Sequence, residues 1–538
     1  MSCSISVAVV FFAAVAVGAD DEPFRKKVIA CSWDLGNYSV YDVLSNKAAF
    51  AALPIDGARI SANGIKLPDG KPLEAWRAFY SPLWPKDALA PLAKPFREAT
   101  AIPSLRHSFT GFSIARTPKT RVDFRDDVGW AQGFANLRQL AALARDGGLK
   151  GLIMDPEDYG KGKQFTRLDG DPPYDEVAKL ARRRGREFAD AVFGEYPSMT
   201  ILAFWAFSHG RQYAVQPDPR EAMRRKGELF IPFLDGMLDA MPPTAKFVDG
   251  DEPSYNYSAY GKDWMNYADK AAANRACIAL ISPENRYKFR AQVQMGFAVY
   301  LDRYTNPKGK FYYTGPVSGS RLVSFDENLR GALRASDEYV WLWCEKFAWV
   351  RWQNLTNPKL RVAFAKDRTW DDELPGMYDS IWAATRPQDF LASRFPEIRG
   401  KGGCTNILKC GVFKLTGKEK YGRPVRRIPV KRGERYVVEY TAKGAGITGS
   451  VSYFNENGGR QWGLSSTTET GEGLRRILVA VPQYTGFINF GVGKPDDDTT
   501  GEVSGIGVYR LPAPPAPEEE TANADNKAKS DEKGEQKK

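Results

Sequence analysis

Histidine is nearly missing from this chain, with two residues among 538, so a metal site built from several imidazoles is excluded. Cysteine is also scarce, and its six residues include no CxxC pair and no Cys/His spacing typical of zinc. Cys404 and Cys410, in GGCTNILKC, could close a small loop in an oxidising compartment or could remain two unpaired thiols. The sequence therefore predicts no bound metal and no cofactor.

Long apolar runs are missing except at the N-terminus. MSCSISVAVVFFAAVAVGADDEP has an apolar core from Ile5 to Val17, followed by the small residues Gly18 and Ala19. This pattern is typical of a secretory signal, although it lacks the usual leading Lys or Arg, and it is short for a membrane span. We expect residues 1–19 to be removed near Ala19, giving a secreted or periplasmic protein with no membrane span. The sequence gives no indication of the oligomeric state.

Dense clusters of one charge are rare, although the chain is basic overall, with a formal net charge of +11. The one compact basic run, residues 182–186, lies in an expected amphipathic helix over 174–193 and is interpreted as a solvated helix face. No basic motif has aromatic residues interleaved with it, so nucleic acid is not expected as a partner. The positive charge is compatible with an anionic polysaccharide but does not require one.

Between residues 20 and 397, short strand-like runs alternate with helix-like segments. The expected strands cover residues 26–34, 56–61, 102–109, 151–157, 200–208, 245–252, 293–304 and 339–347. Strands that alternate with helices indicate a parallel sheet of the α/β class, and eight such units predict a (β/α)₈ TIM barrel. A doubly wound open sheet is the alternative, but no glycine-rich nucleotide loop follows an early strand.

The pattern changes in the C-terminal part of the chain. Residues 398–511 contain short alternating strands separated by Gly and Asn turns, which predict an all-β sandwich. Residues 512–538 begin PAPPAPEEE and continue without a large apolar residue, so we expect a disordered charged tail.

Acidic and aromatic residues gather at the ends of the expected strands. In a TIM barrel the carboxyl ends of the strands carry the active site. Asp155 and Glu157 share one face of the fourth strand, and Trp341, Trp343 and Glu345 share one face of the last, because side chains alternate along a strand. Carboxylates among aromatic rings are typical of a sugar site, since the acids act on the glycosidic bond and the rings stack on the sugar.

With these features, residues 26–511 resemble secreted TIM-barrel glycoside hydrolases that carry a C-terminal carbohydrate-binding sandwich of the family 4/9 type. The resemblance is architectural, and its most specific parts are GLIMDPE, similar to the Asp-x-Glu that ends strand four in several hydrolase families, and YVWLWCEK. It implies that Glu157 donates the proton and that Asp155 assists it. Chitinase-like enzymes have further acids on this strand, but Lys150 and Ile153 stand at those positions here, which argues against assistance by an N-acetyl group.

A second carboxylate must complete such a mechanism. Glu345 and Asp251 are the leading candidates for it, and Asp249, Glu252 and Asp302 are further candidates. Seven residues at strand ends are expected to bind the substrate: Trp33, Asp34, His107, His209, Tyr300, Asp302 and Trp343. Two long aromatic segments, residues 76–85 and 306–319, are expected to wall the cleft.

The sequence therefore predicts a glycoside hydrolase that cleaves a complex polysaccharide or oligosaccharide by two-carboxylate acid/base catalysis. Two alternatives remain open at this point. One is a glycan-binding protein without catalysis, in which the acids bind sugar hydroxyls. The other is a metal-dependent polysaccharide lyase or esterase that uses the acids in 249–252 for a hard cation such as Ca²⁺.

Overall fold

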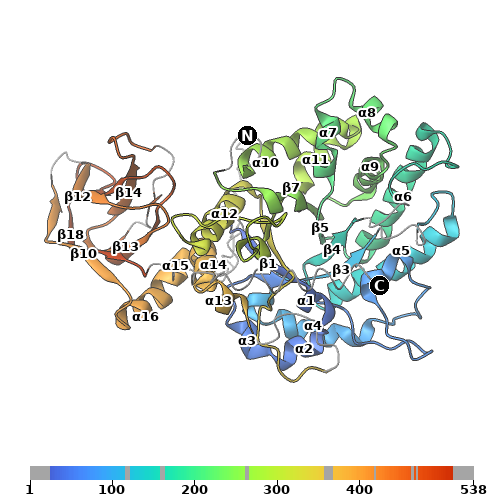
Figure 1. The fold of residues 1–538 in the computed structure, drawn as a ribbon, viewed down its shortest axis with the longest axis horizontal. Coiled ribbons are helices and arrows are strands. Elements are labelled where there is room, and N and C mark those ends of the chain that lie inside the picture. Colours follow the sequence, from blue (N-terminus) through green and yellow to red (C-terminus); the bar gives the residue numbers. More distant parts are fainter. Residues whose placement is uncertain are drawn as a thin grey trace, which may run out of the picture.

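The computed structural model describes residues 25–114, 121–157, 164–260, 266–356, 368–416, 420–461, 466–467 and 471–512. The predicted signal segment and all but the first residue of the predicted tail lie outside these ranges. Figure 1 shows a parallel-stranded part with surrounding helices on the right and a part made of antiparallel strands on the left. Among the described residues, no helix is both long enough and apolar enough to cross a membrane.

The parallel strands form two sheets that meet at both edges. The strand orders are β2-β1-β9-β8 and β3-β4-β5-β6-β7, and every pairing is parallel. Gly296 alone separates β7 from β8, and a parallel bridge joins Arg59, next to β2, to Phe109 of β3. The strands are β1 (Lys27–Ser32), β2 (Gly57–Ala58), β3 (Phe109–Ser113), β4 (Gly151–Asp155), β5 (Thr200–Ala203), β6 (Lys246–Asp249), β7 (Val293–Met295), β8 (Phe297–Tyr300) and β9 (Tyr339–Cys344).

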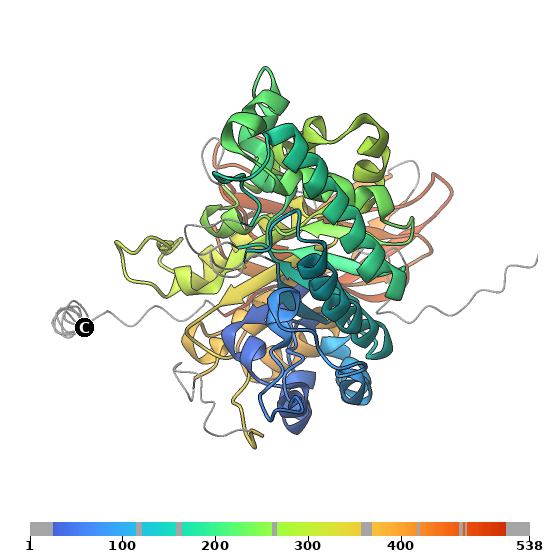
Figure 2. The same ribbon diagram turned by 90° about the vertical axis from the view of Figure 1, so that its right-hand side faces the viewer.

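Helices connect and cover these strands; Figure 2 shows α5 and α6, in teal to green, side by side on the outside. The α-helices of this part are α1 (Trp33–Asn37), α2 (Val40–Ser45), α3 (Lys47–Ala51), α4 (Ala93–Thr100), α5 (Asp127–Asp146), α6 (Tyr174–Glu195), α7 (Arg211–Ala214), α8 (Pro219–Lys226), α9 (Phe230–Ala240), α10 (Tyr267–Ala276), α11 (Arg286–Gln292), α12 (Arg321–Ala335), α13 (Trp370–Glu373), α14 (Met377–Thr385), α15 (Pro387–Asp389) and α16 (Phe395–Gly400). Short 3₁₀ helices add η1 (Ala75–Tyr80), η2 (Ala90–Leu92), η3 (Pro103–Leu105), η4 (Phe207–Gly210), η5 (Glu252–Asn256), η7 (Cys277–Leu280), η8 (Pro283–Asn285) and η9 (Leu301–Tyr304), and η10 (Phe390–Arg394) is a π-helix.

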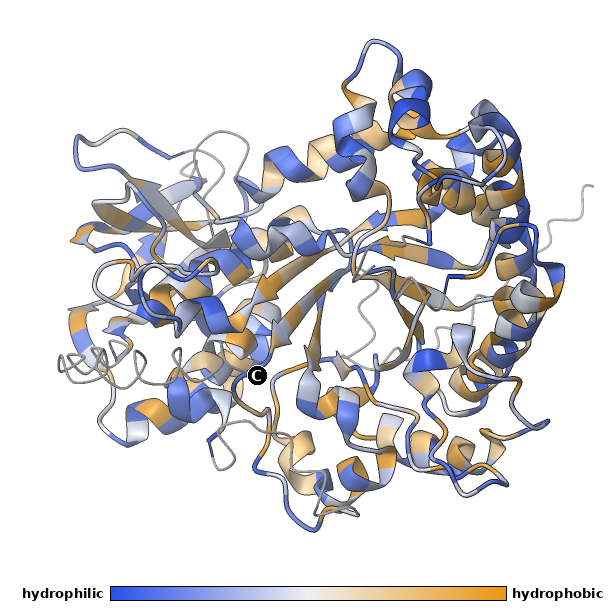
Figure 3. Cartoon of the chain, turned by 45° about the vertical axis from the view of Figure 1, so that its right-hand side comes forward, coloured by the Kyte–Doolittle hydropathy of each residue, from blue (hydrophilic) through white to orange (hydrophobic). Residues whose placement is uncertain are grey.

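Both faces of the parallel strands are buried. Leu152 and Met154 of β4 pack toward the helices, whereas Ile153 packs with Leu202 and Trp341 in a second, inner cluster. This alternation makes the strands almost continuously apolar, as their orange colour in Figure 3 shows. Trp341, Trp343 and Val340 lie on the faces that the period-two pattern predicts.

None of the eight expected strands has its predicted boundaries in the structure, and three of them differ most. The prediction of a strand over 102–109 is wrong: Pro103 begins the 3₁₀ helix η3, which suits its fixed φ and missing N–H, and β3 starts only at Phe109. The expected fifth strand stops at Ala203, and residues 301–304 leave the sheet as η9.

The C-terminal antiparallel strands form two sheets around a common apolar core. One sheet has the order β10-β18-β13-β16 with β11 also paired to β18, and the other has the order β12-β17-β14-β15. The strands are β10 (Thr405–Cys410), β11 (Phe413–Leu415), β12 (Tyr421–Pro429), β13 (Arg435–Lys443), β14 (Thr448–Phe454), β15 (Ser466–Thr467), β16 (Gly473–Ala480), β17 (Phe487–Gly493) and β18 (Gly501–Arg510). Cys404 is a free thiol, and the side chain of Cys410 lies outside the described residues.

The helices that follow β9 fasten the antiparallel part to the parallel part. Phe390, Leu391 and Phe395 pack against Val437 and Tyr509 in a separate apolar cluster. Charged groups surround this contact: Arg432 forms two hydrogen bonds with Glu327 of α12, and Glu439 accepts from both Arg399 and Arg476. The two parts therefore meet through an apolar contact bordered by ion pairs.

Gly185 allows α6 and α9 to pack closely, which gives a test of the fold. A Cβ at position 185 would lie 1.8 Å from the Phe233 carbonyl oxygen. We expect Gly185→Ala to lower the free energy of unfolding by roughly 1–3 kcal/mol, because the methyl group forces the helices apart. Equilibrium denaturation measures this change.

Gly194, near the end of the same helix, is the matched control, because no atom lies within 4 Å of a Cβ there. Gly194→Ala is expected to leave stability unchanged or raise it by up to about 1 kcal/mol through helix propensity. Equal losses in both variants would contradict the predicted packing.

Candidate active site

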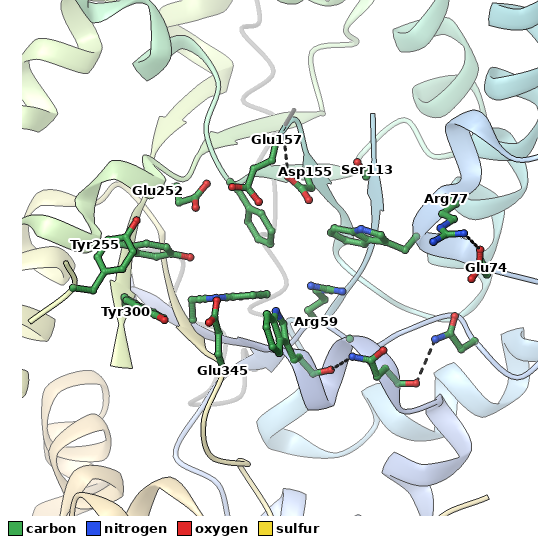
Figure 4. A pocket seen from close by; sticks show the side chains of 18 residues that line it. Arg59, Glu74, Arg77, Ser113, Asp155, Glu157, Glu252, Tyr255, Tyr300 and Glu345 are labelled. Atoms are coloured by element: carbon green, nitrogen blue, oxygen red, sulfur yellow. Dashed lines mark hydrogen bonds and ion pairs between the residues drawn. The ribbon is translucent and has the colours of Figure 1, made fainter. Parts of the chain in front are cut away.

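A pocket of about 790 Å³ opens at the carboxyl ends of the parallel strands (Figure 4). Every parallel strand except β7 contributes to it at its end or just beyond. These residues are Trp33, Arg59, Ser113, Asp155, Glu157, Phe204, Glu252, Tyr300, Trp343 and Glu345. Connecting segments add Gly36, Asn37, Asn63, Glu74, Trp76, Arg77, Tyr255 and Tyr312.

Five carboxylates line this pocket: Glu74, which is paired with Arg77 at 2.7 Å, and Asp155, Glu157, Glu252 and Glu345. Asp155 ends β4, and its Oδ1 accepts a 2.9 Å hydrogen bond from the Glu157 backbone N–H. The Glu252 backbone N–H donates to the Phe204 carbonyl at 2.8 Å, which fixes the segment after β6 against the segment after β5. In Figure 4, Asp155, Glu157 and Glu252 lie on one side of the open space and Glu345 lies on the other.

Glu252 is the carboxylate most affected by its surroundings. Burial raises its pKa, and the negative charges of Glu157, Asp155 and Glu345 raise it further, to about 9. None of the described residues donates a hydrogen bond to the carboxyl group that would favour its ionised form. Glu252 therefore carries a proton at neutral pH, although an ordinary glutamate is ionised there.

The backbone of Glu345 is hydrogen-bonded to another buried acid, Asp302. The Asp302 carboxylate accepts from the backbone N–H groups of Glu345 at 2.9 Å and Lys346 at 3.3 Å, so it lies behind the pocket wall instead of lining it. Burial raises the pKa of Asp302 to about 6. Trp343 Nε1 donates to Glu345 Oε1 at 3.1 Å, and Tyr300 is hydrogen-bonded to both Asp302 and Glu345. These bonds fix the direction of Glu345.

Aromatic rings form much of the remaining wall. Tyr255 and Tyr300 stack with ring centroids 4.9 Å apart, and Tyr312 packs edge-on against Tyr300 at 5.0 Å. Trp33, 47% exposed, and Trp343 offer further ring faces. Rings of this kind bind the apolar faces of sugar rings, so the pocket combines stacking surfaces with carboxylates.

The prediction that Asp251 belongs to the site must be corrected. Residues 249–252 do not project to one place, because Asp251 adopts a left-handed backbone conformation with φ of 40° and the chain turns there. Its buried carboxylate accepts from Arg211 at 2.8 Å and from Asn274 at 3.1 Å. Asp249 is likewise buried and accepts from Ser208. Only Glu252 of this run lines the pocket.

Besides Asp302, which lies behind the pocket wall, three expected substrate-binding residues lie elsewhere. His107 precedes β3, at the opposite end of the strands, where burial and the charges of Lys150 and Lys27 lower its pKa to about 4. Asp34 is buried in α1 and accepts from Trp352 Nε1 at 2.8 Å. His209 packs beside Trp205 and lies 3.3 Å from Glu228. None of these three side chains lines the pocket.

Arg59, Trp76, Tyr255 and Tyr312 also line the pocket, although none was named in advance. Trp76 and Tyr312 belong to the two aromatic segments that were expected to wall the cleft. Arg59 stands at the end of the second expected strand, where the rule applied to the other strands would have found it. Tyr255 follows the turn after β6, and no pattern in the neighbouring sequence marks it as a pocket residue.

The described residues contain no group of three His, Cys, Asp or Glu side chains arranged to hold a metal ion. Asp249, Asp251 and Glu252 are separated by the turn at residue 251, so the calcium site proposed for residues 249–252 does not form a single ligand set.

No family model matches the chain, and no curated protein matches it by sequence. A sugar phosphate isomerase/epimerase from Parabacteroides distasonis is 13% identical over 68% of this chain and 98% of its own, with a TM-score of 0.30. A Bacteroides ovatus protein with a provisional alpha-L-fucosidase name is 9% identical over 92% of this chain and 74% of its own, with a TM-score of 0.26. A structure named Family 16 Carbohydrate Binding Module-2 is 17% identical over 18% of this chain and 74% of its own, with a TM-score of 0.15. TM-scores this low assign no function to this chain.

The protonated state of Glu252 predicts a dependence of stability on pH. An acid whose pKa rises on folding destabilises the folded state as the pH rises from its unfolded value, near 4.5, toward 9. Glu252→Gln removes this loss, so the variant should gain up to about 1.4 kcal/mol over wild type per pH unit in that window. Urea denaturation at pH 5, 6, 7 and 8 measures the gain.

The exposed Glu176 on α6 provides the control for loss of one carboxylate, as Glu176→Gln. If the free energy of unfolding changes with pH in the same way for wild type and Glu252→Gln from pH 5 to 8, Glu252 is ionised in the folded protein and the prediction is wrong.

Proposed function

We propose that this protein is a glycoside hydrolase that cleaves a polysaccharide or oligosaccharide by two-carboxylate acid/base catalysis. The observation that carries the proposal is a glutamic acid, Glu252, kept protonated beside other carboxylates in a pocket walled by aromatic rings. A general acid must hold a proton at the working pH, whereas the group that attacks or activates water must be ionised. This pocket contains a protonated glutamic acid, Glu252, and other carboxylates that can take the second role.

In this mechanism Glu252 donates its proton to the glycosidic oxygen while the bond to the anomeric carbon breaks. Glu345, oriented by Asp302 and Trp343, either attacks the anomeric carbon or removes a proton from the water that does. The net reaction places the hydrogen of water on the leaving oxygen and its hydroxyl group on the anomeric carbon. NMR of the fresh product distinguishes the two routes by the anomer that forms first.

Glu157 and Asp155 assist on the same side of the pocket as Glu252. Their charges keep the proton on Glu252, and the resemblance in GLIMDPE gives the donor role to Glu157 itself. We assign the resting proton to Glu252 because burial and the neighbouring negative charges raise its pKa. The negative charge of Glu157 is the largest contribution of this kind, since it raises the pKa of Glu252 more than the charges of Asp155 and Glu345 do.

The wider architecture belongs to the same proposal. We propose that residues 20–397 form a closed (β/α)₈ barrel, supported by the two parallel sheets that meet at both edges. Residues 398–511 are proposed as a sandwich that holds the polymer close to the pocket. Export to the cell exterior or periplasm, after cleavage near Ala19, fits a polymeric substrate.

Activity and its dependence on the leaving group test the two catalytic roles. We expect wild type to release reducing sugar from at least one member of a panel of neutral and anionic polysaccharides. Glu252→Gln and Glu345→Gln should each lower kcat by about 10²–10⁴. An aryl glycoside of the same sugar with a good leaving group needs no proton, so it should restore turnover in Glu252→Gln but not in Glu345→Gln.

Glu176→Gln, on the outer surface of α6, is the control variant for this series and should keep full activity. Binding of a polysaccharide without any turnover by wild type would favour a glycan-binding protein. Full activity in Glu252→Gln on natural substrate would remove Glu252 from the mechanism.

The pH profile tests the coupling of Glu157 to Glu252. Glu157→Gln removes a negative charge beside Glu252, so the pKa of Glu252 should fall and the proton should be lost at lower pH. The alkaline limb of kcat/KM should therefore move toward acid by roughly one pH unit. An unmoved limb would contradict the coupling, whereas complete loss of activity would place Glu157 itself in proton transfer.

A further inference from the structure

Arg59 is a buried cation inside the proposed catalytic pocket. The residue directly follows β2, its backbone N–H donates to the Ala30 carbonyl at 2.8 Å, and only 8% of its surface is exposed. Its guanidinium carbon lies 4.0 Å from the centre of the Trp76 ring and 6.0 Å from the centre of the Trp343 ring. Arg59 therefore presents its charge to the pocket from a fixed aromatic support (Figure 4).

Among the described residues, no acceptor receives a hydrogen bond from the guanidinium of Arg59 and no carboxylate forms a close ion pair with it, although the charge of Asp155 attracts it from further away. Other arginines differ. The buried Arg184 donates to Asp127, Glu187 and the Phe124 carbonyl, and Arg77 at the same pocket is paired with Glu74 at 2.7 Å. A guanidinium has five N–H donors, and burying them without acceptors costs free energy. This cost is explained if a ligand supplies the acceptors.

The backbone of Gly36 makes room for this arrangement. A Cβ at position 36 would lie 2.4 Å from Arg59 Nη2 and 2.9 Å from its Cζ. Gly36 and Trp76 both lie against the flat guanidinium and limit the orientations that it can adopt. A group held in this way loses little conformational entropy when it binds a planar anion.

We propose that Arg59 binds an anionic substituent of the substrate, a carboxylate or a sulfate group on a sugar ring in the pocket. The inference rests on the proposed function and names its substrate class as an anionic glycan. Oxyanions pair with guanidinium through two parallel hydrogen bonds, which neutral sugar hydroxyls cannot match. The net charge of +11 would also draw a polyanion toward the protein.

Binding of matched oligosaccharides tests the proposal independently of turnover. One pair compares uronic-acid oligosaccharides with their carboxyl-reduced forms, and a second compares sulfated with desulfated oligosaccharides. Calorimetry should show that wild type binds the charged member of one pair about 10–100-fold more tightly. The pair that shows the preference identifies the anion as carboxylate or sulfate.

Arg59→Gln should bind the charged and neutral members equally, and Arg59→Lys should keep a weaker preference, because lysine retains the charge without the two parallel donors. Gly36→Ala leaves Arg59 in the chain but displaces its guanidinium, so it should also lose the preference. Arg138→Gln, an exposed arginine on α5, is the control and should bind like wild type. Thermal unfolding of each variant confirms that it is folded.

Two results would overturn the proposal: equal binding of charged and neutral members by wild type in both pairs, or an unchanged preference in Arg59→Gln. A charge preference that disappears in Arg59→Gln, in a protein that shows no hydrolysis, would support the anion site and reject the proposed hydrolase. Hydrolysis without any charge preference would support the proposed hydrolase and reject the anion site.

Discussion

Carboxylates that share a small pocket repel one another, and the aromatic walls remove much of the water that would otherwise stabilise their charges. In this protein the charges of Asp155, Glu157 and Glu345 act on Glu252. Glu252 keeps its proton because a fourth negative charge there would be repelled by the other three. The repulsion between these acids is unfavourable, and the packing of the strands that position them offsets it. The raised pKa of Glu252 and part of the instability of the pocket therefore have the same physical origin.

Buried acids elsewhere in the chain are stabilised in a different way. Asp251 is paired with Arg211, and Asp249 accepts hydrogen bonds from Ser208 and nearby backbone N–H groups. Asp302 is also satisfied by backbone donors, and through them it directs Glu345 into the pocket. These acids support the structure, whereas Glu252 has no comparable donor among the described residues. The difference separates supporting acids from candidates for chemistry.

Much of the strand pattern and part of the site could be predicted from the sequence, because side-chain alternation is a local property. The faces of Ile153, Trp341 and Trp343 follow from period two alone, and so does the direction of Asp155 and Glu345 into the pocket. Aromatic residues in two long connecting segments were also sufficient to locate part of the wall. In each case the neighbouring residues along the chain carry the information.

The sequence by itself determined which strands alternate with helices and which of their side chains share a face, because these depend on local periodicity. Only the tertiary structure decided that Glu252 reaches the pocket while Asp251 and His107 do not. A left-handed turn at Asp251 reverses the direction of the acids around it, and His107 lies before its strand instead of after it. Backbone turns and strand starts of this kind are fixed by contacts between segments far apart in the chain, which no local pattern records.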